Sequence, residues 1–150
     1  MALGKGKQPQ ERDTGPAEPE ILLDRERIAR RVEELAARIS TDYRDRELLV
    51  VGILNGAFVF MADLIRRLSV RCCCDFIRLS SYCRDVSSGQ VQLTKDLETP
   101  IRARDVLIVE DIVDTGLTLA WLTETLRSRQ PASLRVCAFL DKPARRKVPF

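Results

Sequence analysis

Short apolar runs alternate along this chain with stretches whose apolar residues recur at helical spacing, and this alternation limits the possible folds more than any other feature. The clearest runs have the length and composition of strands that are covered on both faces. They are Leu48–Leu54, Val106–Glu110 and Leu134–Leu140, and Val70–Tyr82 is a further strand candidate. The helical stretches are Ala57–Leu68 and a segment that Thr115-Gly116 opens and Gln130-Pro131 closes. Strands that alternate with helices predict an α/β fold, with a parallel-sheet core flanked by helices on both faces.

Three further segments surround this alternation. Asp24 can cap a first helix. The apolar positions that follow it at helical spacing are Ile28, Val32, Leu35, Ala36 and Ile39. Met1–Glu20 is rich in Pro, Gly and charged residues, so we expect a disordered tail ahead of one domain over residues 21–150. Cys83–Leu97 is polar with Ser-Ser-Gly at its centre, which favours a loose hairpin or mobile loop outside the sheet.

The available residue types restrict the chemistry. The chain has five cysteines, none of them in a CxxC pair, and no histidine; this argues against a structural zinc site or a disulfide framework. Without histidine, catalysis must use carboxylates, Lys, Arg, Tyr, hydroxyls or backbone groups. The net charge of +3 comes from interspersed residues and does not indicate nucleic-acid binding. No apolar run is long enough to span a membrane and the first twenty residues lack a signal-peptide pattern, so we expect a cytoplasmic protein.

Three carboxylates stand at the end of one predicted strand: Glu110, Asp111 and Asp114. In an open α/β sheet, ligands bind beyond the carboxyl ends of the strands. Ionised groups left dry and unpaired there would cost several kcal/mol each. They become favourable if they accept hydrogen bonds from the vicinal hydroxyls of a sugar or face Mg²⁺, which prefers one or two carboxylates plus substrate oxygens.

The residues Asp114-Thr115-Gly116-Leu117-Thr118 then bend into a helix. Free backbone N–H groups, two hydroxyls and a glycine that permits close approach suit this helix start to a phosphate. Neither a Walker A loop nor a GxGxxG fingerprint is present. In the alternative interpretation, Asp114 and Thr115 cap a helix and the two preceding acids are solvated. The complete pattern of four apolar residues followed by Glu-Asp-x-x-Asp-Thr-Gly-x-Thr favours a phosphorylated ribose as the ligand.

The segment Val106–Thr118 (VLIVEDIVDTGLT) resembles the phosphoribosyl-pyrophosphate signature of type I phosphoribosyltransferases. Within those, the chain is most similar to the hypoxanthine-guanine phosphoribosyltransferase family. Further matches are VGILNGAFVFMADLIRRL (Val51–Leu68), IRLSSY (Ile77–Tyr82) and FLDK (Phe139–Lys142), so the similarity runs from about Ile21 to the end. The resemblance implies a Rossmann-like parallel sheet with a small hood.

The resemblance also implies a role for each residue of the signature. Glu110 and Asp111 would meet the ribose hydroxyls and the metal, and Asp114 would lie near purine N7 as a general base or acid. The residues that match the 5′-phosphate loop are Thr115, Gly116, Leu117 and Thr118. Leu117 stands where some members of the family have Lys.

The other motifs supply the rest of the implied site. The residues that match the pyrophosphate loop, which contains a non-proline cis peptide bond in the family, are Leu54, Asn55 and Gly56. Asn55 replaces a Lys seen in some relatives. Ser81 and Tyr82 match the start of the flexible loop that closes over the site. Lys142, which alone would be a surface lysine, matches the lysine that hydrogen-bonds the purine 6-oxo group. The basic cluster Arg145-Arg146-Lys147 is interpreted as solvated, with a phosphate contact as the alternative.

The implied activity is transfer of the 5-phosphoribosyl group from phosphoribosyl pyrophosphate to N9 of hypoxanthine or guanine. The products would be IMP or GMP together with pyrophosphate. The cofactor would be Mg²⁺. The family usually forms dimers or tetramers, and no nucleic-acid or membrane partner is expected. Alternatives are transfer to another base, an inactive truncated transferase, and a non-catalytic or regulatory relative that binds a nucleotide or RNA. In the family the chain continues past the position of Phe150 into the base-binding hood, so we expect an incomplete hood and better retention of sugar-phosphate binding than of turnover.

Overall fold

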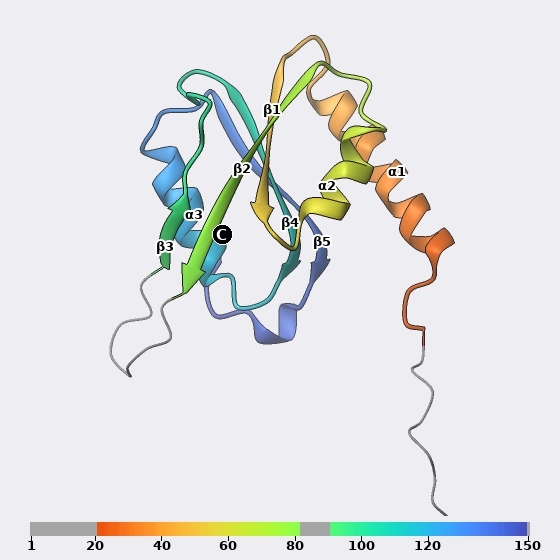
Figure 1. Ribbon diagram of the computed structural model, residues 1–150. Coiled ribbons are helices and arrows are strands. Elements are labelled where there is room, and N and C mark those ends of the chain that lie inside the picture. Colours follow the sequence, from red (N-terminus) through yellow and green to blue (C-terminus); the bar gives the residue numbers. More distant parts are fainter. Residues whose placement is uncertain (1–20, 82–90, 150) are drawn as a thin grey trace, which may run out of the picture.

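A five-stranded sheet with helices on both faces forms the centre of the fold (Figure 1). The computed structural model describes residues 21–81 and 91–149. The elements in chain order are α1 (Arg25–Asp42), β1 (Leu48–Leu54), α2 (Phe58–Ile65), β2 (Cys72–Ser81), β3 (Val91–Lys95), β4 (Asp105–Val113), α3 (Leu117–Arg127), β5 (Ser133–Asp141) and the 3₁₀ turn η1 (Pro143–Arg145). The strand order is β3-β2-β1-β4-β5, in which β3 is antiparallel to β2 and every other pair is parallel.

The central strand β1 shows why the sheet needs a layer of helices on each face. All its residues from Leu48 to Ile53 are buried, which is typical of a strand covered on both sides. One core cluster joins β1 to α1 and α2 through residues such as Val50, Ala36 and Met61. A second cluster joins the opposite face to α3 through Leu122. The predicted α/β architecture is therefore confirmed.

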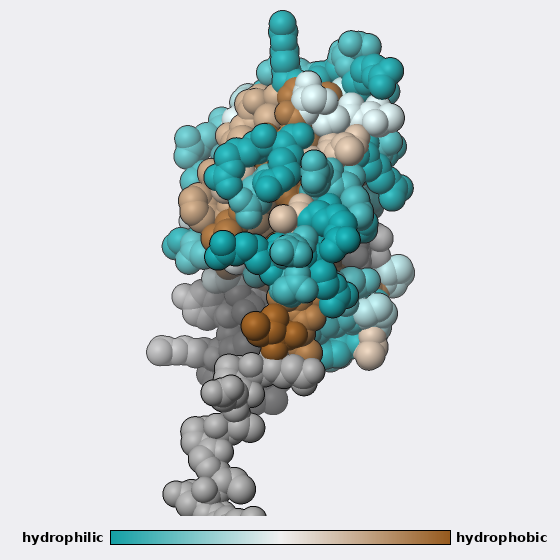
Figure 2. Space-filling model, turned by 90° about the vertical axis from the view of Figure 1, so that its right-hand side faces the viewer, coloured by the Kyte–Doolittle hydropathy of each residue, from teal (hydrophilic) through white to brown (hydrophobic). Residues whose placement is uncertain are grey.

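Helix α1 begins where the sequence predicts. The carboxylate of Asp24 accepts a hydrogen bond of 2.7 Å from the backbone N–H of Arg27, which satisfies one of the unpaired donors of the first turn. The predicted apolar stripe faces the sheet, with Val32, Ala36 and Ile39 buried. Figure 2 shows the side of the molecule at the right of Figure 1, where α1 runs; polar residues cover most of it, with apolar groups between them.

Helix α2 is shorter than the predicted Ala57–Leu68. It ends at Ile65, because the backbone N–H groups of Arg67 and Leu68 bond to carbonyls three residues earlier, at 3.0 and 3.3 Å. Such bonds belong to the tighter turns that often end α-helices. The guanidinium of Arg67 donates to the carbonyl of Asp63 at 2.9 Å, so a cation stabilises this helix end.

The prediction that Cys83–Leu97 lies outside the sheet is wrong for Val91–Lys95. These residues form β3 and pair with the outer edge of β2, for example Leu79 with Leu93. Leu93 packs against the core cluster on the α3 side. An alternating apolar side chain and an otherwise unpaired strand edge together explain why this segment joins the sheet. Residues 83–90 lie outside the described ranges.

Within residues 21–81 and 91–149, no helix is long and apolar enough to cross a membrane.

Candidate active site

The carboxyl end of β4 extends further than the sequence predicts, and this extension positions the acidic residues. The predicted strand ends at Glu110, whereas β4 continues to Val113. Its pairing with β1 stops at Gly52 and Val109, while its pairing with β5 continues to Val113 and Asp141. Glu110 and Asp111 therefore lie on a part of β4 that no longer pairs with β1. The partner β5, which keeps this edge extended, is remote in sequence, so the local pattern does not predict the extension.

A cavity of about 230 Å³ lies at this end of the sheet. Its lining combines the predicted acids with the predicted phosphate-binding residues of the following turn. The lining residues are Glu110, Asp111, Ile112, Val113, Asp114, Thr115, Gly116, Thr118 and Leu119. Leu117 belongs to the predicted set but does not line the cavity, and its side chain is exposed. The structure thus brings together most of the segment on which the sequence prediction rests.

The two adjacent acids are coupled to each other and to the backbone. Glu110 Oε1 accepts a hydrogen bond of 3.0 Å from the Asp111 N–H, and Asp111 Oδ1 accepts one of 2.8 Å from the Ile112 N–H. Burial, and then the interaction with the Asp111 carboxyl group, raises the pKa of Glu110 to about 8. The pair therefore holds a proton at neutral pH, and hydroxyl donors or a cation would stabilise its fully ionised form.

The predicted pyrophosphate loop packs directly on Asp111. A Cβ atom built on Gly56 would lie 2.1 Å from Asp111 Oδ2, so a larger residue at this position would displace the carboxylate. The peptide bond between Leu54 and Asn55 is cis, as the resemblance implied. Two motifs that are far apart in the sequence thus meet at the carboxyl ends of β1 and β4.

The helix start uses Gly116 rather than a side-chain cap. Gly116 is the N-cap of α3 with φ 84°, in the left-handed region, where glycine is favoured. The hydroxyl of Thr115 accepts from the Leu117 N–H at 3.4 Å, and Thr118 is exposed. The alternative in which Asp114 caps the helix is not supported. A helix start without a capping side chain leaves backbone N–H groups for an anion.

Asp114 faces Arg145, a cation predicted from the sequence to be solvated. Its Oδ1 atom lies 3.0 Å from Arg145 Nε and has no hydrogen-bond partner of acceptable geometry among the described residues. The Arg145 side chain remains 64% exposed. The backbone N–H of Lys142 donates to the Val113 carbonyl at 2.9 Å, and that of Lys147 donates to the Thr115 carbonyl at the same distance. The segment after β5 therefore lies against the predicted phosphate loop, although the Lys142 side chain is exposed and does not line the cavity.

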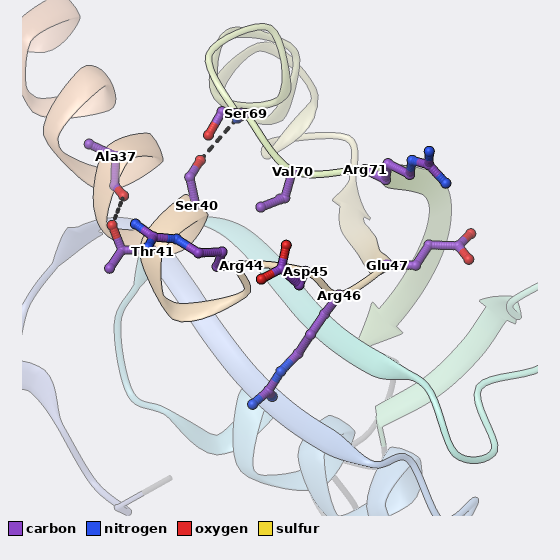
Figure 3. A pocket seen from close by; sticks show the side chains of 10 residues that line it. All are labelled: Ala37, Ser40, Thr41, Arg44, Asp45, Arg46, Glu47, Ser69, Val70 and Arg71. Carbon is purple, nitrogen blue, oxygen red and sulfur yellow. Dashed lines mark hydrogen bonds between the residues drawn. The ribbon is translucent and has the colours of Figure 1, made fainter.

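A larger cavity, of about 760 Å³, lies at the opposite edge of the sheet (Figure 3). It is lined by residues just before β1 and β2, such as Asp45, Glu47 and Arg71. In Figure 3 the side chains of Glu47 and Arg71 point away from the other lining residues. Because ligands of parallel sheets bind at the carboxyl ends of the strands, we place the functional site at the smaller cavity.

A family model for the phosphoribosyl transferase domain matches residues 19–149. The hypoxanthine-guanine phosphoribosyltransferase of Bacillus subtilis is 44% identical over 129 residues, which cover 85% of this chain and 72% of that protein. The Mycobacterium tuberculosis enzyme of the same name is 47% identical over 130 residues, covering 82% of this chain and 64% of the relative. This chain belongs to the hypoxanthine-guanine phosphoribosyltransferase family.

Solved structures of hypoxanthine-guanine phosphoribosyltransferases agree with this fold. A Bacillus anthracis enzyme with a HEPES molecule in its active site superimposes with a TM-score of 0.84 at 41% identity, covering 88% of this chain and 79% of that one. The Trypanosoma cruzi hypoxanthine phosphoribosyltransferase in complex with the product IMP gives 0.76 at 43% identity, covering 83% and 72%. The type I phosphoribosyltransferase fold expected from the sequence is confirmed.

Two of the predicted site residues are only partly described or not described, and one further residue near the site was not predicted. Ser81 ends β2, but its side chain is not described, and Tyr82 lies outside the described residues. Arg78 was missed: its Nη2 atom donates to Asn55 Oδ1 at 2.8 Å. Leu54 and Arg78 are register partners in β1 and β2. Parallel neighbours bring their carboxyl ends together, but a single sequence does not specify that register.

Proposed function

We propose that this chain transfers the 5-phosphoribosyl group from phosphoribosyl pyrophosphate to N9 of hypoxanthine or guanine, which gives IMP or GMP and pyrophosphate. The observation that carries the proposal is the cavity at the end of β4, in which an acid pair and an uncapped helix start line one space. Membership of the family supports the reaction, and a relative that is 43% identical has been solved with IMP.

The sugar and its phosphate would bind to two parts of this cavity. Glu110 and Asp111 supply acceptors that match the vicinal 2′ and 3′ hydroxyls of ribose. The N–H groups and the hydroxyls of Thr115 and Thr118 supply donors for the 5′-phosphate, and Gly116 allows close approach. The diphosphate on C1 would then point toward the loop at Gly56, because that loop packs on Asp111.

The donor chemistry of the acid pair fits Mg²⁺. Glu110 and Asp111 offer carboxylate oxygens, and among the described residues no group of three or more His, Cys, Asp or Glu could hold a metal. Mg²⁺ is commonly held by one or two carboxylates together with substrate oxygens and water, without a dedicated protein cage. When bound, the ion would supply charge neutralisation for the diphosphate leaving group.

The chemical step would be a displacement at C1 of the ribose. Purine N9 forms the new bond as the bond between C1 and the diphosphate oxygen breaks, and pyrophosphate leaves with the electron pair. The proton on N7 of the base passes to Asp114, whose Oδ1 atom lacks a hydrogen-bond partner among the described residues. Lys142 would donate to the 6-oxo group of the base. Positioning and electrostatics account for most of this catalysis, which suits a chain without histidine.

The expected homodimer or homotetramer is part of this proposal. Phe58 and Val59 on α2 are 56% and 68% exposed, whereas Phe60, Met61 and Leu64 of the same helix are buried. These two apolar side chains are candidates for a subunit contact. The cytoplasmic location and the absence of a nucleic-acid partner stay predictions from the sequence.

A panel of bases tests the proposed function. The chain is incubated with phosphoribosyl pyrophosphate, Mg²⁺ and hypoxanthine, guanine, xanthine, adenine or uracil in turn, and nucleoside monophosphate is separated and measured. We expect product with hypoxanthine or guanine. Adenine should give little, because it lacks the 6-oxo group to which Lys142 is proposed to donate, and uracil should give little, because it has no N9. Tight binding of phosphoribosyl pyrophosphate without product from any base would contradict the enzyme proposal and favour a non-catalytic relative.

A further inference from the structure

Apart from the proposed Mg²⁺, the predicted pyrophosphate loop supplies no cationic group to the diphosphate end of the proposed site. A diphosphate carries several negative charges, and Glu110 and Asp111 stand beside it with carboxylates of their own. The loop at Asn55 and Gly56 offers backbone donors and one neutral amide side chain. Charge-assisted hydrogen bonds to phosphate are about twice as strong as neutral ones, so a guanidinium or ammonium group close to this loop would contribute most to binding.

Arg78 is placed to meet this requirement. It lies near the carboxyl end of β2, in register with Leu54 at the end of β1. Its Nη2 atom donates to Asn55 Oδ1 at 2.8 Å. Gly56, the next residue in the loop, packs on the Asp111 carboxylate. The short loop therefore lies between the guanidinium and the acid that is proposed to hold the ribose.

Arg78 and Asp111 both reach the loop that precedes α2. Phe76 belongs to the core cluster that packs under α1 and α2, and side chains two residues apart in a strand point to the same face. Arg78 therefore projects on the α2 side, where it bonds to Asn55. Asp111 lies against Gly56 of the same loop.

Neighbouring cations are already engaged. Lys95, the register partner of Arg78 on β3, lies 3.0 Å from Glu98 and 3.7 Å from Asp75. Arg145 pairs with Asp114 at the other side of the cavity. Arg78 itself is exposed, and no carboxylate of the described residues pairs with it. Among the described residues, no other group engages its remaining donors, which can therefore bind a ligand.

We propose that Arg78 binds the diphosphate of the substrate and of the pyrophosphate product, with Asn55 holding its guanidinium beside the loop. This inference rests on the proposed function and extends it. The cation comes from strand β2, not from the loop itself. Arg78 is thus a substrate-binding residue, and Asn55 is the residue that positions it.

Calorimetric titration with inorganic pyrophosphate in the presence of Mg²⁺ tests the inference. Ribose 5-phosphate, which lacks the diphosphate, is the second probe. We expect Arg78→Gln to weaken pyrophosphate binding by about tenfold or more, the scale of one charge-assisted contact, and to leave ribose 5-phosphate binding within about twofold. Arg78→Lys should recover part of the loss, because a point charge replaces the fork of donors. Arg71→Gln is the matched control: Arg71 is exposed, lies just before β2 and lines the cavity at the opposite edge.

Several results would overturn the inference. They are unchanged pyrophosphate binding by Arg78→Gln, an equal loss for Arg71→Gln, equal losses for both probes, and a wild-type chain that does not bind pyrophosphate. Equal losses for both probes would assign Arg78 a structural role, which thermal unfolding of each variant would show as a lowered Tm. Arg78-dependent binding of pyrophosphate together with no nucleotide from any base would instead keep this inference and remove the proposed function.

Discussion

Asp114 combines two properties that a residue managing a proton needs. Its Oδ1 atom is shielded from solvent and has no hydrogen-bond partner of acceptable geometry among the described residues, while the Arg145 guanidinium lies 3.0 Å away. The open acceptor can receive an N–H from a ligand. Glu110, only four residues earlier in the chain, is more deeply buried, and this burial raises its pKa to about 8. Environment, more than residue type, therefore separates the roles of these acids.

Replacing Asp114 by Asn tests its role in the reaction. We expect Asp114→Asn to lower kcat by about a hundredfold or more, the usual scale of general acid–base catalysis. The dissociation constant for phosphoribosyl pyrophosphate should change little, because other residues hold the sugar and phosphates. Steady-state kinetics and calorimetry measure the two quantities, with Asp63→Asn on α2 as a control. If turnover and binding fall together by the same factor, Asp114 is structural.

The site contacts between residues that are close in the sequence could be predicted from local patterns. Contacts between residues that only the fold brings together could not. The cluster of Glu110, Asp111 and Asp114 was evident because one strand end carries all three. Arg78 gave no local signal, and Arg145 stood out only as part of a basic cluster. Their partners Asn55 and Asp114 are distant in the chain and meet them through strand register and the segment after β5. The site contacts were therefore predictable along one segment, and across segments only where the family resemblance supplied them.

At the scale of elements, the limits of β1 matched the prediction because burial on both faces gives a continuous apolar run. The end of β4 and the place of β3 did not follow from local patterns, because each depends on pairing with another strand. Asp75 in β2 stabilises one such contact between segments that are distant in the sequence. It is buried, and it accepts from the backbone N–H groups of Phe76, Glu98 and Thr99 at 2.7, 2.9 and 2.8 Å. It thereby ties the segment after β3 to β2.

Asp75 also predicts a dependence of stability on pH. Burial alone would raise the pKa of Asp75, but the hydrogen bonds, led by the one from Thr99, outweigh it and lower the pKa below its ordinary value of 3.8. Because the folded state holds the ionised form, this stabilisation is complete above the unfolded pKa and is lost as pH falls through the lowered one. We expect Asp75→Asn to reduce the free energy of unfolding by about 2–3 kcal/mol near pH 7, the scale of hydrogen bonds to a charged group.

Denaturant unfolding from pH 7 down to pH 3 measures this effect. The difference in the free energy of unfolding between Asp75→Asn and the wild-type chain should become smaller as the pH falls below about 4. Asp42→Asn is the control: Asp42 is exposed and pairs with Arg135 through a single contact of 3.1 Å, so its loss should cost less than about 1 kcal/mol. A gap for Asp75→Asn that stays constant over the whole range would contradict the proposed role of its charge.

In the whole molecule, the buried core lies between the sheet and its helices, and the proposed site lies at the carboxyl edge of the sheet. Helices cover both faces of the sheet, so the carboxyl ends of β1, β2 and β4 remain for binding (Figure 1). At this edge the acid pair and the start of α3, from one motif, meet the loop at Gly56, from another. The alternation of strands and helices in the sequence already predicted this edge as the site. The family to which the chain belongs gives the arrangement its chemical interpretation.

Phosphorus NMR of one reaction mixture tests the central claim most directly. The chain, phosphoribosyl pyrophosphate, Mg²⁺ and hypoxanthine are mixed, and the phosphorus signals are followed over time. We predict that the substrate signals disappear while IMP and pyrophosphate appear in equal amounts, and that omitting hypoxanthine stops both. Substrate that persists unchanged, or that breaks down to ribose 5-phosphate at a rate independent of hypoxanthine, would contradict the claim that this chain is a purine phosphoribosyltransferase.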